Sequence, residues 1–467
     1  MKMWSGRFRE SLDPEFEGWQ RSFPFDRRLL GQELAASRAH ARALRTAGIL
    51  DSAELIAILH GLDQLGQQTA AFPEFADDGQ AEDVHHFIER QLVLLIGDTG
   101  FKLHSGRSRN EQIAMDLRLY VREAIDQVRS ELAELCAVFL ERAEQSGSSA
   151  MPAYTHLQRA EPVLVAHWLL AYVEMFLRDA ERLAEIRRRT NVSPLGSGAV
   201  AGATLALKRE AMAADLDCHG ITANSIDATS DRDFVLEFVN ALTLVALHFS
   251  RWAEEMILFS SAEFGFIRLP EAYSTGSSAM PQKKNPDLAE LVRAKSARVI
   301  GQATALLVTL KALPLAYHKD LQETQEPLFA AYETVDALIP LVRGWMRAAE
   351  FDHERMQERA QAGFMNAWAA ATYLVKRGVP SRLAHEVVGR AVQLCLAANC
   401  ELEDLTLEQL RTLSPAFEEG FYACLSPDAV LAMHDVPGGT APARVRQALA
   451  EARQKVDSLR ENVHAHA

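Results

Sequence analysis

The chain has 467 residues, of which 49 are Lys or Arg and 63 are Asp or Glu, so its formal net charge is −14. An acidic chain lacks the basic face that nucleic acids and anionic membranes require, so neither is expected as its main partner. Hydrophobic residues make up 48% and charged residues 24%, which is ordinary for a globular protein and too apolar for a disordered one.

The cysteines and the N-terminal sequence indicate the compartment. The five cysteines are an odd number with no C-x-x-C pair, so we expect reduced thiols rather than disulfides or a structural zinc site. The sequence MKMWSGRFRE has no apolar segment of the signal-peptide type, and no stretch reaches the 18 apolar residues of a membrane span. We therefore expect a cytoplasmic protein.

Apolar residues recur at helical spacing along nearly the whole chain, and strand-like alternation is almost absent. Shorter helical patterns occupy residues 1–106 and 359–467, and residues 107–358 hold the long ones. The five long patterns cover about 111–145, 161–190, 231–261, 286–312 and 324–349. This predicts an all-α protein with three domains and a central long-helix bundle, whose remaining apolar faces pack against other subunits.

Prolines indicate where these helices begin. Pro162, Pro286 and Pro327 lie near the predicted starts, where the missing backbone N–H is tolerated. Pro340 lies inside the last pattern and is expected to kink that helix.

Three segments between the long patterns are dense in polar residues. HSGRSRNEQ places Arg107, Arg109 and Asn110 before a predicted helix N-terminus, where N–H groups and guanidinium groups favour a carboxylate. YTHLQRAEP places Thr155 and His156 ahead of the next helix. The alternatives here are a capped loop with solvated arginines and a structural histidine.

The third segment, STGSSAMPQKKNPDLAE, spans residues 274–290. It combines small hydroxyls with Lys283, Lys284 and Asn285, a composition that favours a mobile loop able to stabilise an anion during catalysis. The alternative is a solvated, disordered loop.

Nucleotide and metal motifs are absent from the sequence. The glycines of SPLGSGAVAG, at residues 193–202, follow no predicted strand and precede no GK[ST], so the dinucleotide and phosphate-loop interpretations fail. The adjacent pairs His85, His86 and His385, Glu386 lack metal-ligand spacing, so no metal is expected.

GSSAMPQKKNPD resembles the signature of the fumarase/aspartase superfamily, G-S-S-x-M-P-x-K-x-N. Within that superfamily, the chain is similar to the argininosuccinate lyase branch, to which lens δ-crystallin is related, in the segments YTHLQRAEP, GRSRN and WSGRF. The resemblance extends over essentially the whole chain through LGSGAVAG, DATSDRDF, YHKDLQE and VPGGTAPARV. The resemblance implies an all-helical homotetramer in which loops of three subunits build each active site. The implied reaction is reversible elimination of L-argininosuccinate to L-arginine and fumarate, without a cofactor.

The resemblance also implies roles for single residues. Ser277 would be the base that removes a proton next to a carboxylate, and Lys283 would stabilise the doubly negative intermediate. His156 would protonate the leaving nitrogen, and Glu290 would orient that histidine. The implied substrate-binding residues are Ser22, Arg109, Asn110, Thr155, Arg232, Asn285, Tyr317, Gln322 and Gln325.

Several positions depart from the family pattern. WSGRF replaces W-G-G-R-F, Glu111 replaces an Asp, His318 replaces an Asn, Gln325 stands where Lys is usual, and NAWAAATYLV lacks an acidic residue that relatives often carry. None of these changes affects the implied base, its lysine or the implied acid. Two other functions therefore stay open: a sister lyase that releases fumarate from another N-substituted aspartate, and a non-catalytic structural protein of the crystallin type.

Overall fold

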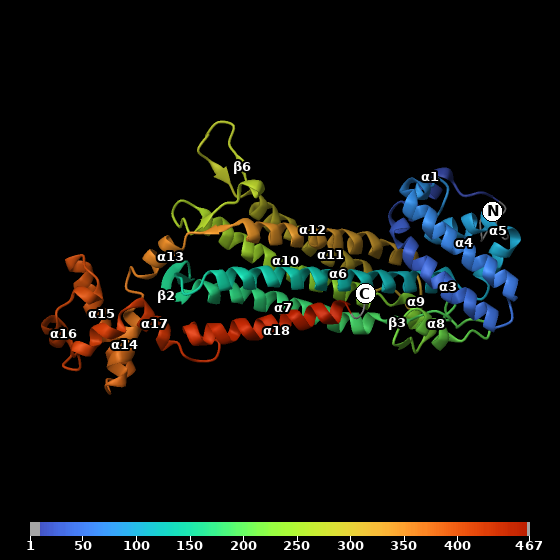
Figure 1. Ribbon diagram of the computed structural model, residues 1–467. Helices are drawn as coiled ribbons and strands as arrows, with labels where there is room; N and C mark the ends of the chain where they lie inside the picture. Colours follow the sequence, from blue (N-terminus) through green and yellow to red (C-terminus); the bar gives the residue numbers. More distant parts are fainter. Residues whose placement is uncertain (1–9, 465–467) are drawn as a thin grey trace. The chain divides into compact units, whose positions relative to one another are not determined.

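The computed structural model describes residues 10–464 (Figure 1). Helices dominate it, which confirms the predicted all-α class. The chain divides into two compact units of three segments each. Unit 1 comprises Met1–Gln127, Arg182–Thr243 and Arg298–Thr334, and unit 2 comprises Val128–Glu181, Leu244–Ala297 and Val335–Ala467. The three-domain division stays a prediction.

Five long helices run through the middle of the chain: α6 (Arg109–Gln145), α7 (Val165–Thr190), α10 (Asp233–Ser260), α11 (Asp287–Leu310) and α12 (Gln325–Ala348). Except at the start of α7, their bounds agree with the predicted ones to within two residues. α12 continues through Pro340. Each long helix contributes a segment to both units, because the unit boundaries fall inside the helices.

The predicted helix start at residue 161 is wrong. Ala150–Thr155 (β1) and Gln158–Leu164 (β2) form an antiparallel hairpin, and α7 begins only at Val165. Pro162 lies opposite Pro152 in this ladder instead of opening a helix. A two-stranded hairpin has free edges that tolerate the missing proline N–H, so the proline did not mark a helix start.

The turn of this hairpin consists of His156 and Leu157, which have φ angles of 56° and 58°. Positive φ at both positions is the geometry of a two-residue turn that matches the twist of the two strands. A positive φ angle is uncommon for residues other than glycine, asparagine and aspartate. The fold therefore holds His156 in a defined, locally strained position.

Unit 1 has a small-residue core. Ala36, Ala39 and Ala43 of α3 (Leu30–Thr46) pack with Met115 and Leu119 of α6. The other helices of this unit are α1 (Pro14–Trp19), α2 (Phe23–Asp26), α4 (Ser52–Ala71), α5 (Val84–Ile96), α8 (Arg209–Asp215) and α9 (Ser225–Ser230), and a parallel pair joins β3 (Val192–Ser193) to β4 (Gly220–Ile221). This core fixes the start of α6.

Unit 2 contains the helices α14 to α16, grouped at the orange to red end of the chain (Figure 1), around buried Phe417 and Phe421. Elsewhere in this unit Trp252 and Trp345 pack edge to face, with ring centroids 5.2 Å apart. The remaining elements are α13 (His353–Ala360), α14 (Ala367–Lys376), α15 (Ser381–Ala398), α16 (Leu407–Leu413), α17 (Pro427–Met433), α18 (Pro442–His464), β5 (Ile267–Arg268) paired with β8 (Glu350–Phe351), and β6 (Thr275–Gly276) paired with β7 (Lys284–Asn285).

One described helix, α10, is long and apolar enough to cross a membrane by length and composition. Half of its most apolar 18-residue window is buried inside the structure. The core helix of a bundle passes the same test, so this feature gives little support for a membrane span.

Candidate active site

The segment before α6 folds around Glu111. Its buried carboxylate accepts hydrogen bonds from the backbone N–H groups of Ser108 and Gly198, each at 3.0 Å. Gly198 has a φ of 60°, and a Cβ there would lie 2.8 Å from the carbonyl oxygen of Gly202. The glycines at 193–202 therefore serve a tight turn that packs on the start of α6. Asn110 donates to the same turn, at the carbonyl oxygen of Ala199 (3.1 Å).

Arg109 pairs with two acidic residues that precede α5. Its guanidinium lies 2.8 Å from Asp83 and 3.5 Å from Glu82. Asp83 also caps α5 by accepting a hydrogen bond from the N–H of His86 (2.7 Å). Burial alone would raise the pKa of Asp83, but the charge of the His85 ring, 3.8 Å away, and the charge of Arg109 hold this pKa well below its ordinary value.

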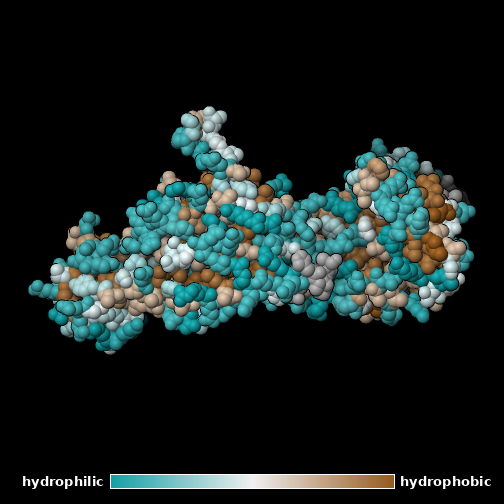
Figure 2. All heavy atoms as spheres, in the orientation of Figure 1, coloured by the Kyte–Doolittle hydropathy of each residue, from teal (hydrophilic) through white to brown (hydrophobic). Residues whose placement is uncertain are grey.

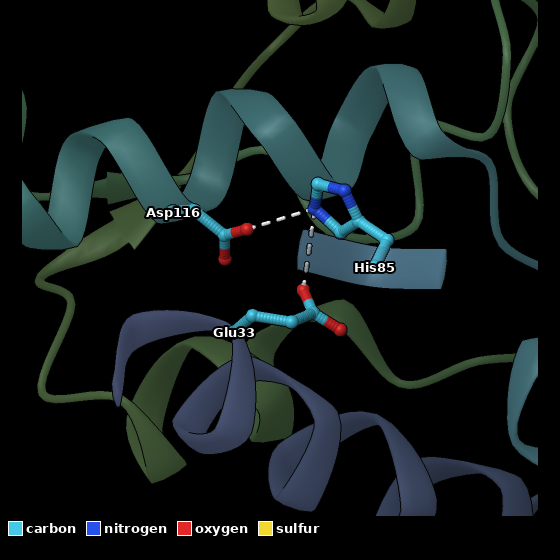
Figure 3. A group of neighbouring side chains, drawn as sticks. All are labelled: Glu33, His85 and Asp116. Carbon is cyan, nitrogen blue, oxygen red and sulfur yellow. Dashed lines mark hydrogen bonds and ion pairs between the residues drawn. The ribbon is translucent and has the colours of Figure 1, made fainter. Parts of the chain in front are cut away.

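Figure 3 shows His85 of α5 between Glu33 of α3 and Asp116 of α6. Its Nε2 atom lies 2.9 Å from Asp116 Oδ2 and 3.6 Å from Glu33 Oε2, and all three side chains are buried. Burial alone would lower the pKa of His85, but its hydrogen bond with Asp116 and the nearby carboxylates of Glu33 and Asp83 raise it well above its ordinary value. His85 is therefore a buried imidazolium between acidic side chains, and burial and the charge of Glu33 raise the pKa of one of them, Asp116, to about 8.

This cluster also bears on metal binding. The ligand atoms of Glu33, His85 and Asp116 lie within 4.8 Å of one another, so the group could hold a metal ion. The sequence offered no spacing signal for it, because the three residues come from three different helices. The predicted absence of a metal stays a prediction.

Two other predicted substrate-binding residues of unit 1 are held by hydrogen bonds around α2. Ser22 is buried, and its hydroxyl donates to Asp26 (2.6 Å), whose carboxylate also accepts from the N–H of Val84 (3.0 Å) next to Asp83. Gln322 is buried and donates to the carbonyl oxygen of Gln20 (3.2 Å). Ser22 is thus held by the end of α2, and Gln322 by the segment that precedes α2.

Arg232 is the most deeply buried arginine of the described chain, with 1% of its surface exposed. It donates to the carbonyl oxygen of Asp231 (2.7 Å), whereas its Nε and one Nη have no hydrogen-bond partner among the described residues. Burial lowers the pKa of Arg232 to about 10. Burial raises the pKa of Tyr317, and the charges of Arg232 and Arg109 oppose that rise, so Tyr317 lies within electrostatic reach of both. These unused donors suit an incoming carboxylate.

Gln325, where the family pattern has Lys, is 2% exposed at the start of α12. Its side-chain oxygen has no hydrogen-bond partner among the described residues. A buried amide oxygen without a partner needs a hydrogen-bond donor from outside the unit, and a bound substrate can supply one.

The remaining predicted residues all belong to unit 2. Strands β6 and β7 pair through Gly276 and Lys284, and the loop 277–283 that they close projects from the helices (Figure 1). Ser277 directly follows Gly276 and Lys283 directly precedes Lys284, so these two residues stand at the two ends of the loop. The Ser277 hydroxyl oxygen accepts backbone N–H bonds from Met280 (3.1 Å) and Ala279 (3.3 Å).

Two further hydrogen bonds organise this loop. Asn285 Nδ2 donates to the carbonyl oxygen of Gly276 at 3.4 Å, and the carboxylate of Asp287, in the first turn of α11, accepts from the N–H and hydroxyl of Thr275 at 2.9 and 2.8 Å. Lys283 itself is exposed. The loop is therefore held at its base and free to meet a ligand at its tip.

His156 and Thr155 are exposed at the turn of the β1–β2 hairpin, and Glu290 is exposed on α11. Within residues 10–464, no hydrogen bond or ion pair joins His156 to Glu290. The predicted residues thus form two groups, one in each unit, and the catalytic four all lie in unit 2. The WSGRF motif, residues 4–8, lies outside the described residues.

Sequence reasoning missed the acidic residues that hold Arg109. Asp26, Asp83 and the cluster of Figure 3 are buried titratable groups, and such a residue on a helix face that is otherwise apolar would have been the available signal. The sequence shows the residue types but not which of them are buried.

A family model described as lyase matches residues 6–301, and one described as argininosuccinate lyase C-terminal matches residues 364–432. Among solved structures, an EDDS lyase in complex with formate has a TM-score of 0.83 at 24% identity and covers 98% of this chain and 92% of that one. A class II fumarase from Schistosoma mansoni has a TM-score of 0.72 at 17% identity, covering 85% and 90%. These likenesses define a lyase with the fumarase/aspartase fold.

Curated relatives narrow this class. Argininosuccinate lyase of Koribacter versatilis (strain Ellin345) is 57% identical over 467 residues, which is 100% of both chains. The enzyme of that name from Acidobacterium capsulatum is also 57% identical and covers 98% of this chain and 96% of that protein. This chain belongs to the argininosuccinate lyase family.

Proposed function

We propose that this protein splits L-argininosuccinate reversibly into L-arginine and fumarate. One observation carries the proposal. In a chain of this family, the Ser277 hydroxyl oxygen accepts hydrogen bonds from two backbone N–H groups, and Ser277 and Lys283 stand at the two ends of one loop. Those donors favour a negative charge on Ser277 Oγ, which a serine base requires.

The reaction removes a proton from the carbon next to a carboxylate. The electrons that are released make this carboxylate doubly negative, so cationic and amide donors must stabilise it. Lys283 and Asn285 supply an ammonium and an amide from the same loop. Only a proton moves before the carbon–nitrogen bond breaks, so the step needs no redox cofactor.

The leaving guanidine nitrogen needs a proton. An imidazole exchanges protons near neutral pH, and His156 stands exposed on a rigid turn where it can reach a bound ligand. Glu290, exposed on α11, would orient that imidazole, and Thr155 beside it would bind substrate.

The first group of residues, in unit 1, would bind the carboxylates of the substrate. Arg109 and Arg232 are the cations, Tyr317 and Gln322 supply neutral hydrogen-bond donors, and Ser22 contributes a hydroxyl oxygen. Asn110 and Gln325 complete this set. Its mixture of charged and neutral donors suits a ligand with several carboxylates.

We further propose a cytoplasmic homotetramer, in which residues from different subunits meet in each site. Exposed apolar side chains support association: α11 presents Leu291, Ile300, Leu307 and Val308 to solvent. Figure 2 shows a further apolar surface in the region of α3 to α5, where Ile56, Leu94 and Leu95 are exposed. Apolar surfaces of this kind on a single chain mark interfaces.

Mixing two inactive variants tests this proposal. Ser277→Ala and His156→Asn chains, unfolded and refolded together, should regain argininosuccinate-dependent fumarate release, because some sites would then receive both native residues. Each variant refolded alone is the control. A mixture that forms tetramers by light scattering but stays inactive would mean that each site takes both residues from one chain.

A further inference from the structure

Unit 2 contains a cavity of about 540 Å³ that none of the proposed catalytic residues lines. Cavities of this size accommodate small molecules. Its walls come from β1 and β2, from α7 and α10, from Gly438 and Gly439, and from Ala448 and Glu451 of α18. The two glycines belong to the VPGGT motif, which the proposed reaction leaves without a role.

Aromatic rings form one side of the cavity. Trp168 packs on Phe259 with ring centroids 5.6 Å apart, and Tyr154 lies 6.1 Å from the same phenyl ring. All three line the cavity. The face of an aromatic ring, and of tryptophan above all, attracts a cation.

The charged side chains that line the cavity are acidic. They are Glu174, Glu255 and Glu451, and no lysine or arginine is among the lining residues. Lys455 lies 3.5 Å from Glu174 and is mostly exposed. His167 also lines the cavity, and burial lowers its pKa, which leaves the ring neutral.

Glu255 is the acid that the aromatic side chains hold. Its carboxylate accepts hydrogen bonds from the indole N–H of Trp168 (2.7 Å) and from the hydroxyl of Tyr172. Within the described chain it forms no ion pair. Burial raises the pKa of Tyr172 well above its ordinary value, and the negative charge of Glu255 adds to this rise. The charge of Arg251, one turn earlier on α10, opposes this rise, but Arg251 is exposed and forms no ion pair with Glu255 within the described chain. A half-buried carboxylate with hydrogen-bond donors but no direct ion pair is completed by a cationic ligand.

From these aromatic walls and the uncompensated Glu255 carboxylate, we propose that the cavity binds a small guanidinium compound, with L-arginine as its prototype. The planar guanidinium stacks on Trp168 and donates to Glu255. In argininosuccinate the guanidinium itself carries a succinyl group, whose two carboxylates would meet Glu255, Glu174 and Glu451, so this compound is excluded by charge repulsion. The single carboxylate of L-arginine lies at the far end of its side chain. The site is therefore separate from the active site.

Calorimetry can isolate this site. The Ser277→Ala variant is saturated with argininosuccinate, which fills the active sites, and L-arginine is then titrated into the complex. We expect one further L-arginine per chain. Adding Glu255→Gln should weaken that binding at least about tenfold, because an amide still accepts from Trp168 and Tyr172 but lacks the charge.

Glu254→Gln is the matched control, since Glu254 is exposed on the same helix and pairs with Arg293 outside the cavity. It should leave L-arginine binding unchanged, and neutral L-citrulline should not bind any of the variants. No second binding event, equal affinity in the Glu255→Gln variant, or equal losses in both variants would overturn the proposal. A change of oligomeric state in Glu255→Gln alone would also overturn it, because the cavity would then be a packing surface between copies.

Discussion

The guanidinium of Arg109 lies 2.8 Å from the carboxylate of Asp83, and this carboxylate lies 3.8 Å from the ring of His85. Beyond the ring stand Asp116 and Glu33 (Figure 3). This series of basic and acidic side chains is buried except at its arginine end, which fixes the orientation of a substrate-binding side chain. Such preorganisation lowers the cost of binding a carboxylate.

Asp83→Asn should therefore weaken substrate binding more than turnover. We expect KM for argininosuccinate to rise at least about tenfold with a smaller change in kcat, because Arg109 loses its orientation but stays outside the bond-breaking step. The free energy of unfolding should fall by about 3 kcal/mol, since His85 and Arg109 lose a buried partner. Glu82→Gln, 3.5 Å from Arg109, is the control and should do little. Equal kinetics in both variants would contradict the positioning role.

A second prediction concerns pH. Burial raises the pKa of Asp26 from 3.8 to about 7, with the charge of Asp83 acting in the same direction. The folded state thus favours the protonated carboxyl of Asp26. The stability that this preference adds to the folded state is complete below pH 3.8 and is lost as pH rises to about 7.

Asp26→Asn, which keeps a neutral side chain at every pH, should not lose this contribution. Denaturant unfolding at fixed protein concentration should show the wild type losing stability relative to the variant between pH 4 and 7, by at most about 1.4 kcal/mol per pH unit. Asp77→Asn, at an exposed carboxylate, is the control. Parallel stability curves for wild type and Asp26→Asn would show that Asp26 is ionised throughout.

The long helices could be predicted from the sequence because their apolar stripes repeat over many turns, which fixes both helix type and bounds. The β1–β2 hairpin could not, because its strands are short and Pro162 is equally compatible with a helix start. Motif resemblance indicated Ser277, His156 and Lys283. It did not indicate the buried charges behind Arg109, because Glu33, His85 and Asp116 lie far apart in the sequence and meet only in the folded unit.

A third prediction distinguishes Ser277 from its neighbour Ser278, and Lys283 of the loop from Lys284 of β7. Ser277→Ala and Lys283→Met should each lower kcat about a hundredfold, the typical loss for one donor or base aimed at the developing charge. Ser278→Ala and Lys284→Met are matched controls, and Lys284 pairs with exposed Glu271 (2.8 Å). Near-wild-type turnover in Ser277→Ala or Lys283→Met, measured by fumarate formation, would remove that residue from the mechanism.

Gln325 gives a fourth prediction. A neutral amide binds a carboxylate less strongly than an ammonium does, by about 1 kcal/mol. Gln325→Lys should therefore lower KM for argininosuccinate roughly fivefold, with little change in kcat. The side chain is buried, so the same change should destabilise the ligand-free protein.

Gln127→Lys, at an exposed position of α6, controls for added charge. An unchanged KM in Gln325→Lys would mean that another cation already supplies this charge. If Gln325→Lys created argininosuccinate activity that the wild type lacks, the natural substrate would be a different succinyl adduct.

Fumarate release by the wild-type protein tests the central claim most directly. Purified protein is given argininosuccinate, adenylosuccinate and aspartate in parallel, with Ser277→Ala as the control, and fumarate is followed by its ultraviolet absorbance. Rapid fumarate release from argininosuccinate alone, with one L-arginine formed per fumarate and loss of the signal in Ser277→Ala, is the predicted result. Faster release from either of the other two compounds, or none from argininosuccinate, would contradict it.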